Sequence, residues 1–119
     1  MLLLYIFSVP SKGPNITSVN VINSTALKVT WEKLSLDYSN GDITKYEVCY
    51  DDEIFSTDCP FNKEVKSTDT MIVLAGLNEA TTYYIRVRAA TKIGFGELGI
   101  VKSNTTLEDS KYLNLIFDK

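Results

Sequence analysis

Apolar and polar residues alternate along short segments of this chain, and the alternation predicts β-strands. In one such segment, Leu27, Val29 and Trp31 are separated by Lys28 and Thr30. Because successive side chains of a strand point to opposite faces, this period of two indicates a strand with one buried face. Similar patterns with turn signals between them predict strands at 15–21, 27–31, 43–50, 61–66, 70–74, 83–89 and 98–106.

No segment repeats its apolar residues at the spacing of a helix, so the chain is predicted to be all-β. The segment 77–83 adds a more specific signal, because a leucine, a short polar link and a tyrosine precede the alternating residues Ile85, Val87 and Ala89. This order is typical of a tyrosine corner, in which we expect the phenol to donate to the backbone upstream. Seven short antiparallel strands with such a corner predict an immunoglobulin-like β-sandwich.

The inward side chains of these strands form the predicted core. Trp31 is more typical of a core residue than of a ligand platform, because large aromatic side chains dominate the interior of small domains. Tyr83 is predicted to be structural in the same sense. The expected core comprises Trp31, Tyr46, Val48, Leu77, Tyr83, Ile85 and Val87.

The composition restricts the function. A chain of 119 residues is long enough for one domain with its own hydrophobic core. Its net charge of −3 argues against nucleic acid as a partner. Because histidine is absent, the usual general base and the commonest metal ligand are missing, and we expect no catalytic residue, metal or cofactor. The carboxylate pairs Asp51-Asp52 and Glu108-Asp109 do not change this, since adjacent side chains on an extended chain point apart.

The cysteines and the glycosylation sequons favour a secreted or cell-surface protein. Cys49 and Cys59 fit neither a redox motif nor a zinc ligand set. A disulfide between them is favoured over two free thiols, because cross-strand neighbours lie close enough for the bond. Asn15, Asn23 and Asn104 each begin an Asn-x-Ser/Thr sequon. Together these features predict an extracellular location, where disulfides persist.

Both ends of the sequence are predicted to lie outside the domain. Residues 1–12 are interpreted either as a minimal signal peptide or as the remnant of an upstream segment. The domain is expected to cover residues 13–108, followed by a tail at 109–119. Neither end contains the roughly 20 apolar residues of a membrane-spanning helix, so membrane attachment would require another part of a longer chain.

Several motifs, taken in order, resemble those of the fibronectin type III domain. They are Pro14 ahead of the first strand, Leu27-x-Val29-x-Trp31, Asn40-Gly41-x-Ile43-x-x-Tyr46-x-Val48-x-Tyr50, and the segment 77–89 followed by Gly94-x-Gly96. The resemblance implies two sheets, in which the strands that the family names A, B and E face C′, C, F and G. The sequence departs from the family at Glu79-Ala80, where a Pro-Gly pair is common.

The resemblance also implies a role. The tandem-array members of this family occur in adhesion molecules and receptor tyrosine phosphatases, which implies a non-catalytic extracellular module that binds proteins and spaces neighbouring type III domains. The alternative is an accessory type III domain of an enzyme, in a receptor phosphatase ectodomain or a secreted glycosidase, with catalysis elsewhere in a longer chain. The sequence contains neither an RGD tripeptide nor a WSxWS box, so neither of those recognition functions carries over.

Two surfaces are candidates for contact with a protein partner. The loops at 32–42 and 92–97 are predicted to share one pole of the sandwich, with Asn23 and Asn104 near the other. The candidate partner contacts on these loops are Tyr38, Asp42, Ile93 and Phe95. The second surface is the outer face of strands 43–50 and 83–89, which is expected to be a solvated ladder of charges, with a recognition surface as the alternative. Its outward residues are Lys45, Glu47, Cys49, Tyr84, Arg86 and Arg88.

Overall fold

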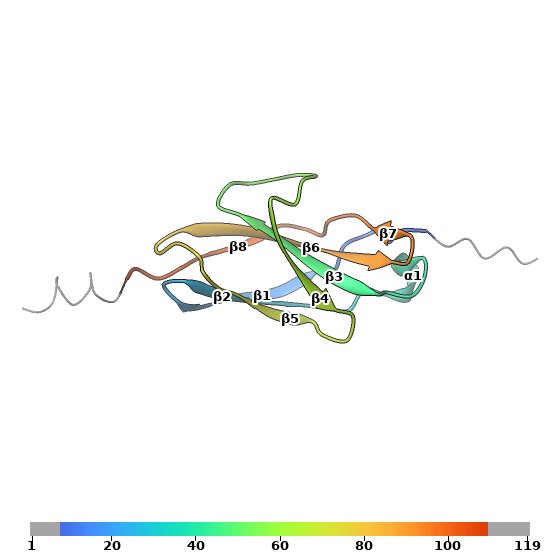
Figure 1. Ribbon diagram of the computed structural model, residues 1–119, viewed down its shortest axis with the longest axis horizontal. Helices are drawn as coiled ribbons and strands as arrows, with labels where there is room; N and C mark the ends of the chain where they lie inside the picture. The colour runs from blue at the N-terminus through green and yellow to red at the C-terminus, as the bar shows by residue number, and fades with distance from the viewer. Residues whose placement is uncertain (1–7, 110–119) are drawn as a thin grey trace, which may run out of the picture.

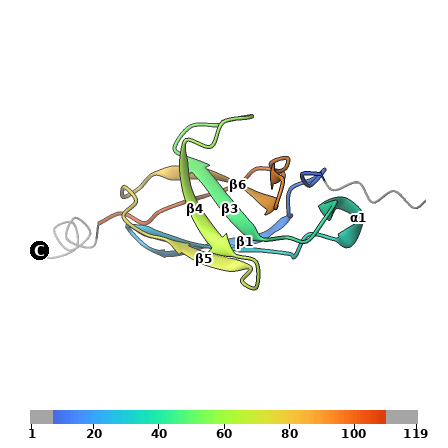
Figure 2. The same cartoon turned by 45° about the vertical axis from the view of Figure 1, so that its right-hand side comes forward.

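The protein is a sandwich of two antiparallel β-sheets (Figures 1 and 2). The computed structural model describes residues 8–109. One sheet has the order β1-β2-β5, and the other has the order β4-β3-β6-β7, with β8 pairing with β6. The elements are β1 (Ile16–Asn23), β2 (Ala26–Trp31), α1 (Leu36–Ser39), β3 (Lys45–Asp51), β4 (Phe61–Lys66), β5 (Met71–Leu74), β6 (Thr82–Thr91), β7 (Gly94–Phe95) and β8 (Lys102–Thr105). The predicted immunoglobulin-like β-sandwich is confirmed.

The helix α1 is absent from the sequence prediction. It is a single turn, and its start is fixed by Ser35, whose side-chain oxygen accepts a hydrogen bond from the amide of Asp37. Asn40 ends the turn in the left-handed conformation, with a φ of 54°. A helix of four residues is too short to repeat an apolar face, so the hydrophobic pattern could not reveal it.

The last predicted strand, 98–106, is divided in the structure. β7 forms a hairpin with the end of β6, inside the predicted loop 92–97, and β8 resumes the pairing further on. Between them the chain stays beside β6, because the amides of Gly96 and Gly99 donate to Ala89 and Val87. The segment ahead of β1 crowds this stretch: a Cβ atom at Gly13 would lie 2.0 Å from the amide nitrogen of Gly99.

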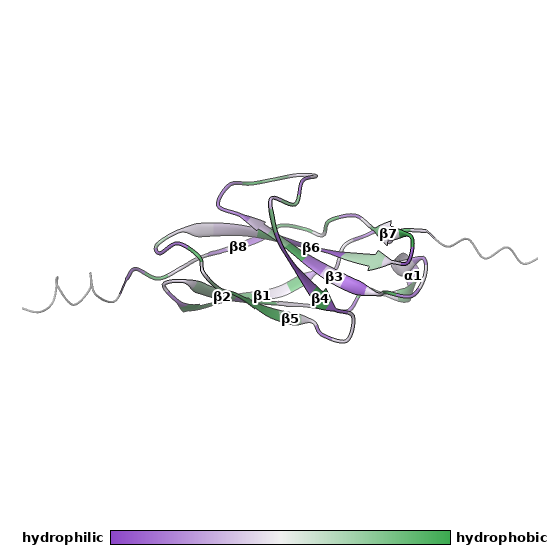
Figure 3. Cartoon of the chain, viewed as in Figure 1, coloured by the Kyte–Doolittle hydropathy of each residue, from purple (hydrophilic) through white to green (hydrophobic). Residues whose placement is uncertain are grey.

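The core lies between the two sheets and is centred on Trp31. The indole is 2% exposed and packs edge-on against Tyr46, with ring centroids 5.7 Å apart. All seven residues expected in the core are buried, and Leu27, Val29 and Leu74 join them. At the edge of its sheet, β5 is hydrophobic along its whole length (Figure 3), and Met71 and Val73 are about half exposed, at 51% and 46%.

A tyrosine corner joins β5 to β6. The phenol oxygen of Tyr83 accepts a hydrogen bond from the amide of Asn78 at 2.8 Å, which reverses the expected direction of donation. Thr106 completes the corner, since its hydroxyl donates to the carbonyl of Asn78 at 2.6 Å. Ala80 adopts a φ of 47°, a left-handed conformation that costs little only for glycine. The corner therefore keeps its shape although Glu79-Ala80 replaces Pro-Gly.

Replacing Tyr83 by phenylalanine should lower the free energy of unfolding by about 1–2 kcal/mol, because the half-buried amide of Asn78 loses its acceptor. Denaturant unfolding of the two proteins measures the difference. Tyr84→Phe is the matched control, since Tyr84 is the next residue of β6 and points to the opposite face. Equal midpoints for Tyr83→Phe and the wild type would contradict a structural role for the phenol.

Residues 8–12 contact the loop that contains α1. The amides of Ser8 and Ser11 donate to the carbonyls of Asn40 and Tyr38, at 3.1 and 2.9 Å. The side-chain amide of Asn40 donates in turn to Val9, and the hydroxyl of Thr91 donates to Ser8. The start of the domain at residue 13 stays a prediction, and these five residues are attached to it by hydrogen bonds.

Candidate binding surface

One end of the sandwich carries both loops on which partner contacts are predicted. The β2–β3 loop with α1 and the β6–β7 hairpin lie at this end (Figures 1 and 2), which we call the α1 pole and define as residues 32–42 and 91–97. The hairpin turn consists of Lys92 and Ile93 alone, because Thr91 pairs with Gly94. The turn is therefore short and holds Ile93 at the tip.

The α1 pole carries some of the exposed large apolar side chains of the domain, and others lie elsewhere on the sandwich. Tyr38 is 37% exposed and Ile93 is 56% exposed, and Asp42 is exposed as well. Leu36 is 88% exposed, more than Tyr38 or Ile93, and sequence reasoning missed it. The only signal for it was a leucine within a loop of mostly polar residues. Exposed apolar side chains on loops at one end of a domain are candidates for contact with a protein partner.

A cavity of about 510 Å³ lies on the side of the α1 pole where the N-terminal segment passes. Tyr38 lines it, and the ammonium of Lys12 sits 4.2 Å from the centroid of the Tyr38 ring, a cation–π contact. Glu32, Lys33 and Ile100 are among the other charged and apolar residues that line it. Because the lining combines acidic, basic and apolar residues, the cavity suits the side chains of a protein better than a small ligand that carries charge of one sign.

Phe95 belongs to a different face of the molecule. Its ring lies beneath the cationic groups of Arg88 and Lys45, at 4.3 and 5.0 Å from its centroid, on the outer face of β3 and β6. It does not line the cavity beside Tyr38. Of the four predicted contacts, Tyr38 is the one that lines this cavity, and the roles of Asp42, Ile93 and Phe95 as contacts stay predictions.

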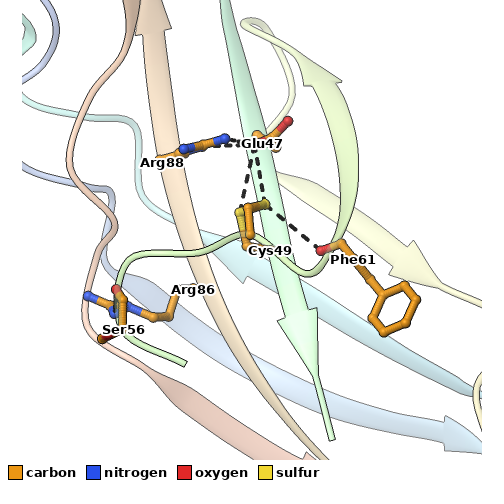
Figure 4. Close-up of a disulfide and its surroundings, with 7 residues drawn as sticks. Glu47, Cys49, Ser56, Phe61, Arg86 and Arg88 are labelled. Carbon is orange, nitrogen blue, oxygen red and sulfur yellow. Dashed lines mark hydrogen bonds and ion pairs between the residues drawn. A yellow bond between two sulfur atoms is a disulfide. The ribbon is translucent and has the colours of Figure 1, made fainter. Parts of the chain in front are cut away.

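The outer face of β3 and β6 differs from the solvated ladder predicted for it. Glu47 is 5% exposed, and Arg88 donates to its carboxylate from both Nε, at 2.8 Å, and Nη2 (Figure 4). Cys49, the next outward residue of β3, is fully buried. The expectation of a solvated charge ladder is therefore wrong for these positions, because part of the chain covers them.

A disulfide joins Cys49 in β3 to Cys59, just ahead of β4 (Figure 4). The carboxylate of Glu47 lies 3.3 Å from Sγ of Cys59. Disulfide sulfur has no proton to donate, so this is a close contact rather than a hydrogen bond. The side chains of Glu47, Cys49 and Cys59 lie near one another. Because the two sulfur atoms are bonded to each other, they are not thiolate ligands, and the group is no metal site in this oxidised form.

Arg86 fixes the segment that covers this face. Its guanidinium donates to the carbonyls of Phe55 and Ser56 in the β3–β4 loop, and to those of Leu98 and Gly99 beside β6. Figure 4 shows its side chain reaching Ser56. Arg86 is therefore a structural residue that connects the β3–β4 loop to the sheet, and the disulfide anchors the far end of the same loop.

Another cavity, of about 530 Å³, lies near the tyrosine corner. Tyr50, Tyr83 and Phe61 form its aromatic side, and Asp51 and Asp52 are at its rim. Burial raises the pKa of the Tyr50 phenol, and the neighbouring Tyr83 adds to the effect. Asp52 is exposed and Asp51 is half-buried with its carboxylate turned back to the amide of Asp52, so the pair is not arranged as two facing carboxylates.

The sequence model of the fibronectin type III domain matches residues 9–103. The chain belongs to the fibronectin type III family. The resemblance drawn from its motifs is confirmed, and so is the non-catalytic character of the module at the level of the family. Among residues 8–109 of this type III domain, no helix is both long enough and apolar enough to cross a membrane.

Similar type III domains occur in large cell-surface proteins. Receptor-type tyrosine-protein phosphatase F of Mus musculus is 36% identical over 90 residues, which are 76% of this chain and 4% of that protein. Protein sidekick-1 of Gallus gallus is 33% identical over 90 residues, with shares of 75% and 4%. Contactin-3 of Homo sapiens is 29% identical over 97 residues, with shares of 82% and 9%. The chain thus spans less than a tenth of each relative, and like their type III domains it is extracellular or at the cell surface.

Solved structures share the fold. The third fibronectin III domain of the human KIAA0343 protein has a TM-score of 0.71 and 24% identity, and the match covers 86% of each chain. The fn3 domain of human contactin 1 has a TM-score of 0.69 and 21% identity, over 92% of this type III domain and 89% of that chain.

The three sequons of this type III domain occupy different environments. Asn15 is exposed and lines the cavity beside Tyr38. Asn23 is exposed at the turn between β1 and β2, whereas Asn104 lies half-buried within β8. The β1–β2 turn and β8, which carry Asn23 and Asn104, lie toward the end opposite the α1 pole (Figure 1), where both sequons are predicted. Glycosylation of Asn15 and Asn23 stays a prediction, whereas the half-buried position of Asn104 argues against the glycan predicted there.

Proposed function

We propose that this type III domain is a non-catalytic protein-binding and spacer module of an extracellular adhesion or receptor protein. The observation that carries the proposal is the exposure of Leu36, Tyr38 and Ile93 on the two loops of the α1 pole. Exposed apolar side chains grouped at an end formed by loops are typical of contacts between proteins. The partner is expected to be a protein and not a nucleic acid, because the net charge is −3.

The spacer role is supported by the course of the chain. Residue 8 enters at the α1 pole and residue 109 leaves at the opposite end (Figure 1). A domain with its two ends at opposite poles lengthens a chain when it is placed in series with others. Neighbouring type III domains in a longer gene product fit this arrangement, and the small share of each relative that the chain covers agrees with it.

Alanine scanning tests the binding surface. The domain, presented as multimers that capture weak contacts, is exposed to an array of purified cell-surface ectodomains, and the affinity of each variant for a bound ectodomain is measured. The variants are Leu36→Ala, Tyr38→Ala, Asp42→Ala, Ile93→Ala and Phe95→Ala. We expect at least one variant at the α1 pole to weaken binding by about tenfold or more, as truncation of a hot-spot residue does.

Val73→Ala is the matched control, because Val73 is an apolar residue of β5 with 46% exposure, similar to Ile93. It should bind as the wild type does. Wild-type affinity for all five variants would reject the α1 pole as the binding surface. A loss of affinity confined to Val73→Ala would show that the partner contacts β5 instead.

The second candidate is an accessory domain of an enzyme whose catalysis resides elsewhere in a longer chain. The 36% identity to a receptor-type tyrosine-protein phosphatase favours the phosphatase form of this alternative over the glycosidase form. Sequencing of the complete transcript separates the two functions. A downstream phosphatase or glycosidase domain would establish the accessory role, and further adhesion domains alone would reject it.

A further inference from the structure

The folded domain uses the asparagine side chains of two of its sequons in opposite ways. In Asn104-Thr105-Thr106, the side-chain nitrogen of Asn104 donates a hydrogen bond to the carbonyl of Val19 at 2.7 Å. Val19 belongs to β1 and Asn104 belongs to β8, so this bond connects the two sheets along one side of the sandwich. The nitrogen that a glycan would occupy is therefore turned toward the neighbouring strand and is half-buried there.

The third residue of the same sequon is also engaged. Thr106 is 3% exposed, its hydroxyl donates to Asn78, and it accepts a hydrogen bond from the amide of Thr81 at 3.0 Å. These contacts fix the tyrosine corner to the end of β8. The residue types at positions 104 and 106 are thus explained by the fold alone.

The sequon Asn23-Ser24-Thr25 presents the reverse arrangement. Ser24 and Thr25 form the two-residue turn between β1 and β2, since Asn23 pairs with Ala26. The side-chain oxygen of Asn23 accepts hydrogen bonds from the amide of Thr25 at 2.9 Å and from its hydroxyl at 3.3 Å. With the oxygen held against the turn, the side-chain nitrogen of this exposed residue is directed to solvent, and within residues 8–109 it has no hydrogen-bond partner.

We infer that the secreted protein carries an N-linked glycan on Asn23 and leaves Asn104 unmodified. In the transfer, the amide nitrogen forms a bond to the anomeric carbon of the sugar. The bond from that carbon to a lipid-linked pyrophosphate breaks, and the amide proton is taken up with the pyrophosphate leaving group. At Asn23 the product fits the folded turn without losing a hydrogen bond. At Asn104 one hydrogen of the side-chain nitrogen is bonded to Val19 and the residue is half-buried, so a sugar on that nitrogen crowds β1 and disfavours closure of the sandwich.

Site mapping on the full chain tests this inference directly. The 119-residue chain, preceded by a secretion signal, is produced in eukaryotic cells, and the secreted protein is deglycosylated enzymatically in heavy-oxygen water. Each asparagine that carried a glycan becomes a heavy aspartate, which peptide mass spectrometry locates. We expect the label at Asn23 and an unmodified Asn104. A label at Asn104 at the level of Asn23, or an unlabelled Asn23, would overturn the inference.

Two variants give an independent readout through the mass of the intact secreted protein. Asn23→Gln should remove the mass of one glycan. Asn104→Gln should leave the glycan mass unchanged and lower the thermal midpoint, because the hydrogen bond to Val19 is lost. Loss of one glycan from Asn104→Gln would contradict the inference. If that variant is not secreted, site mapping on the wild type still decides, and the test is independent of any binding partner.

Discussion

Replacing Trp31 by alanine should lower the free energy of unfolding by about 3–5 kcal/mol. The indole is 2% exposed, and its edge-on contact with Tyr46 connects β2 of one sheet to β3 of the other. Truncation leaves a cavity between two sheets whose backbones are fixed by hydrogen bonds, so the surroundings can relax only partly. Denaturant unfolding followed by circular dichroism measures the loss without relying on the fluorescence of the deleted tryptophan.

Leu36→Ala serves as the control for this variant. It also removes a large apolar side chain, but one that is 88% exposed, so its effect on unfolding should stay within about 0.5 kcal/mol. A Trp31→Ala protein that unfolds at the wild-type denaturant concentration would show that the indole is not the centre of the core.

Arg88→Met should destabilise the protein by about 2–4 kcal/mol, because it leaves the carboxylate of Glu47 buried without its partner. The side chain of Glu47 is 7% exposed and that of Arg88 is 23% exposed, so the pair is less hydrated than a surface ion pair. Methionine keeps most of the length and apolar volume of the arginine stem. The expected loss is therefore mainly electrostatic.

Two comparisons distinguish an electrostatic cause of the lost stability from a loss of side-chain packing. Combining Arg88→Met with Glu47→Leu should recover most of the stability, since no charge is then left unpaired. Lys45→Met breaks the neighbouring pair with Glu64, whose side chains are 39% and 55% exposed, and should cost less than about 1 kcal/mol. Equal losses for Lys45→Met and Arg88→Met would show that burial does not distinguish the two pairs.

The sequence predicts the inner faces of this sandwich well. The period of two assigns Val48, Ile85 and Val87 to the buried side of β3 and β6, and each is fully buried in the structure. Tyr83 identifies the corner between the sheets because its position relative to Leu77 depends on residues close together in the chain. Both signals are local, so a single sequence can contain them.

The outer face of β3 could not be predicted in the same way. Alternation shows to which side Glu47 and Cys49 point, but it does not show whether another segment covers that side. The cover comes from the β3–β4 loop, which Arg86 and the disulfide hold from a distance in sequence. The division of the last strand is also beyond a local pattern, because the stretch between β7 and β8 lies against Gly13, a residue far from β8 in the chain.

The candidate binding surface was predicted in part. The sequence places the two loops at one pole, because the order of strands fixes the end at which each loop emerges. It does not show that Phe95 turns toward Arg88 and Lys45, or that α1 presents Leu36 to solvent. Those orientations depend on a single helical turn and on a two-residue hairpin, for which the hydrophobic pattern has no signature.

The attachment of residues 8–12 to the α1 pole has a mechanical consequence. A pulling force applied ahead of residue 8 acts first on the hydrogen bonds that join residues 8–11 to Tyr38, Asn40 and Thr91. These bonds are few, whereas β1 is held to β2 along its whole length. Tension along a longer chain would therefore disturb the loop around Tyr38 before any strand separates, and stretching would change the surface that the domain offers to a partner while the sandwich stays intact.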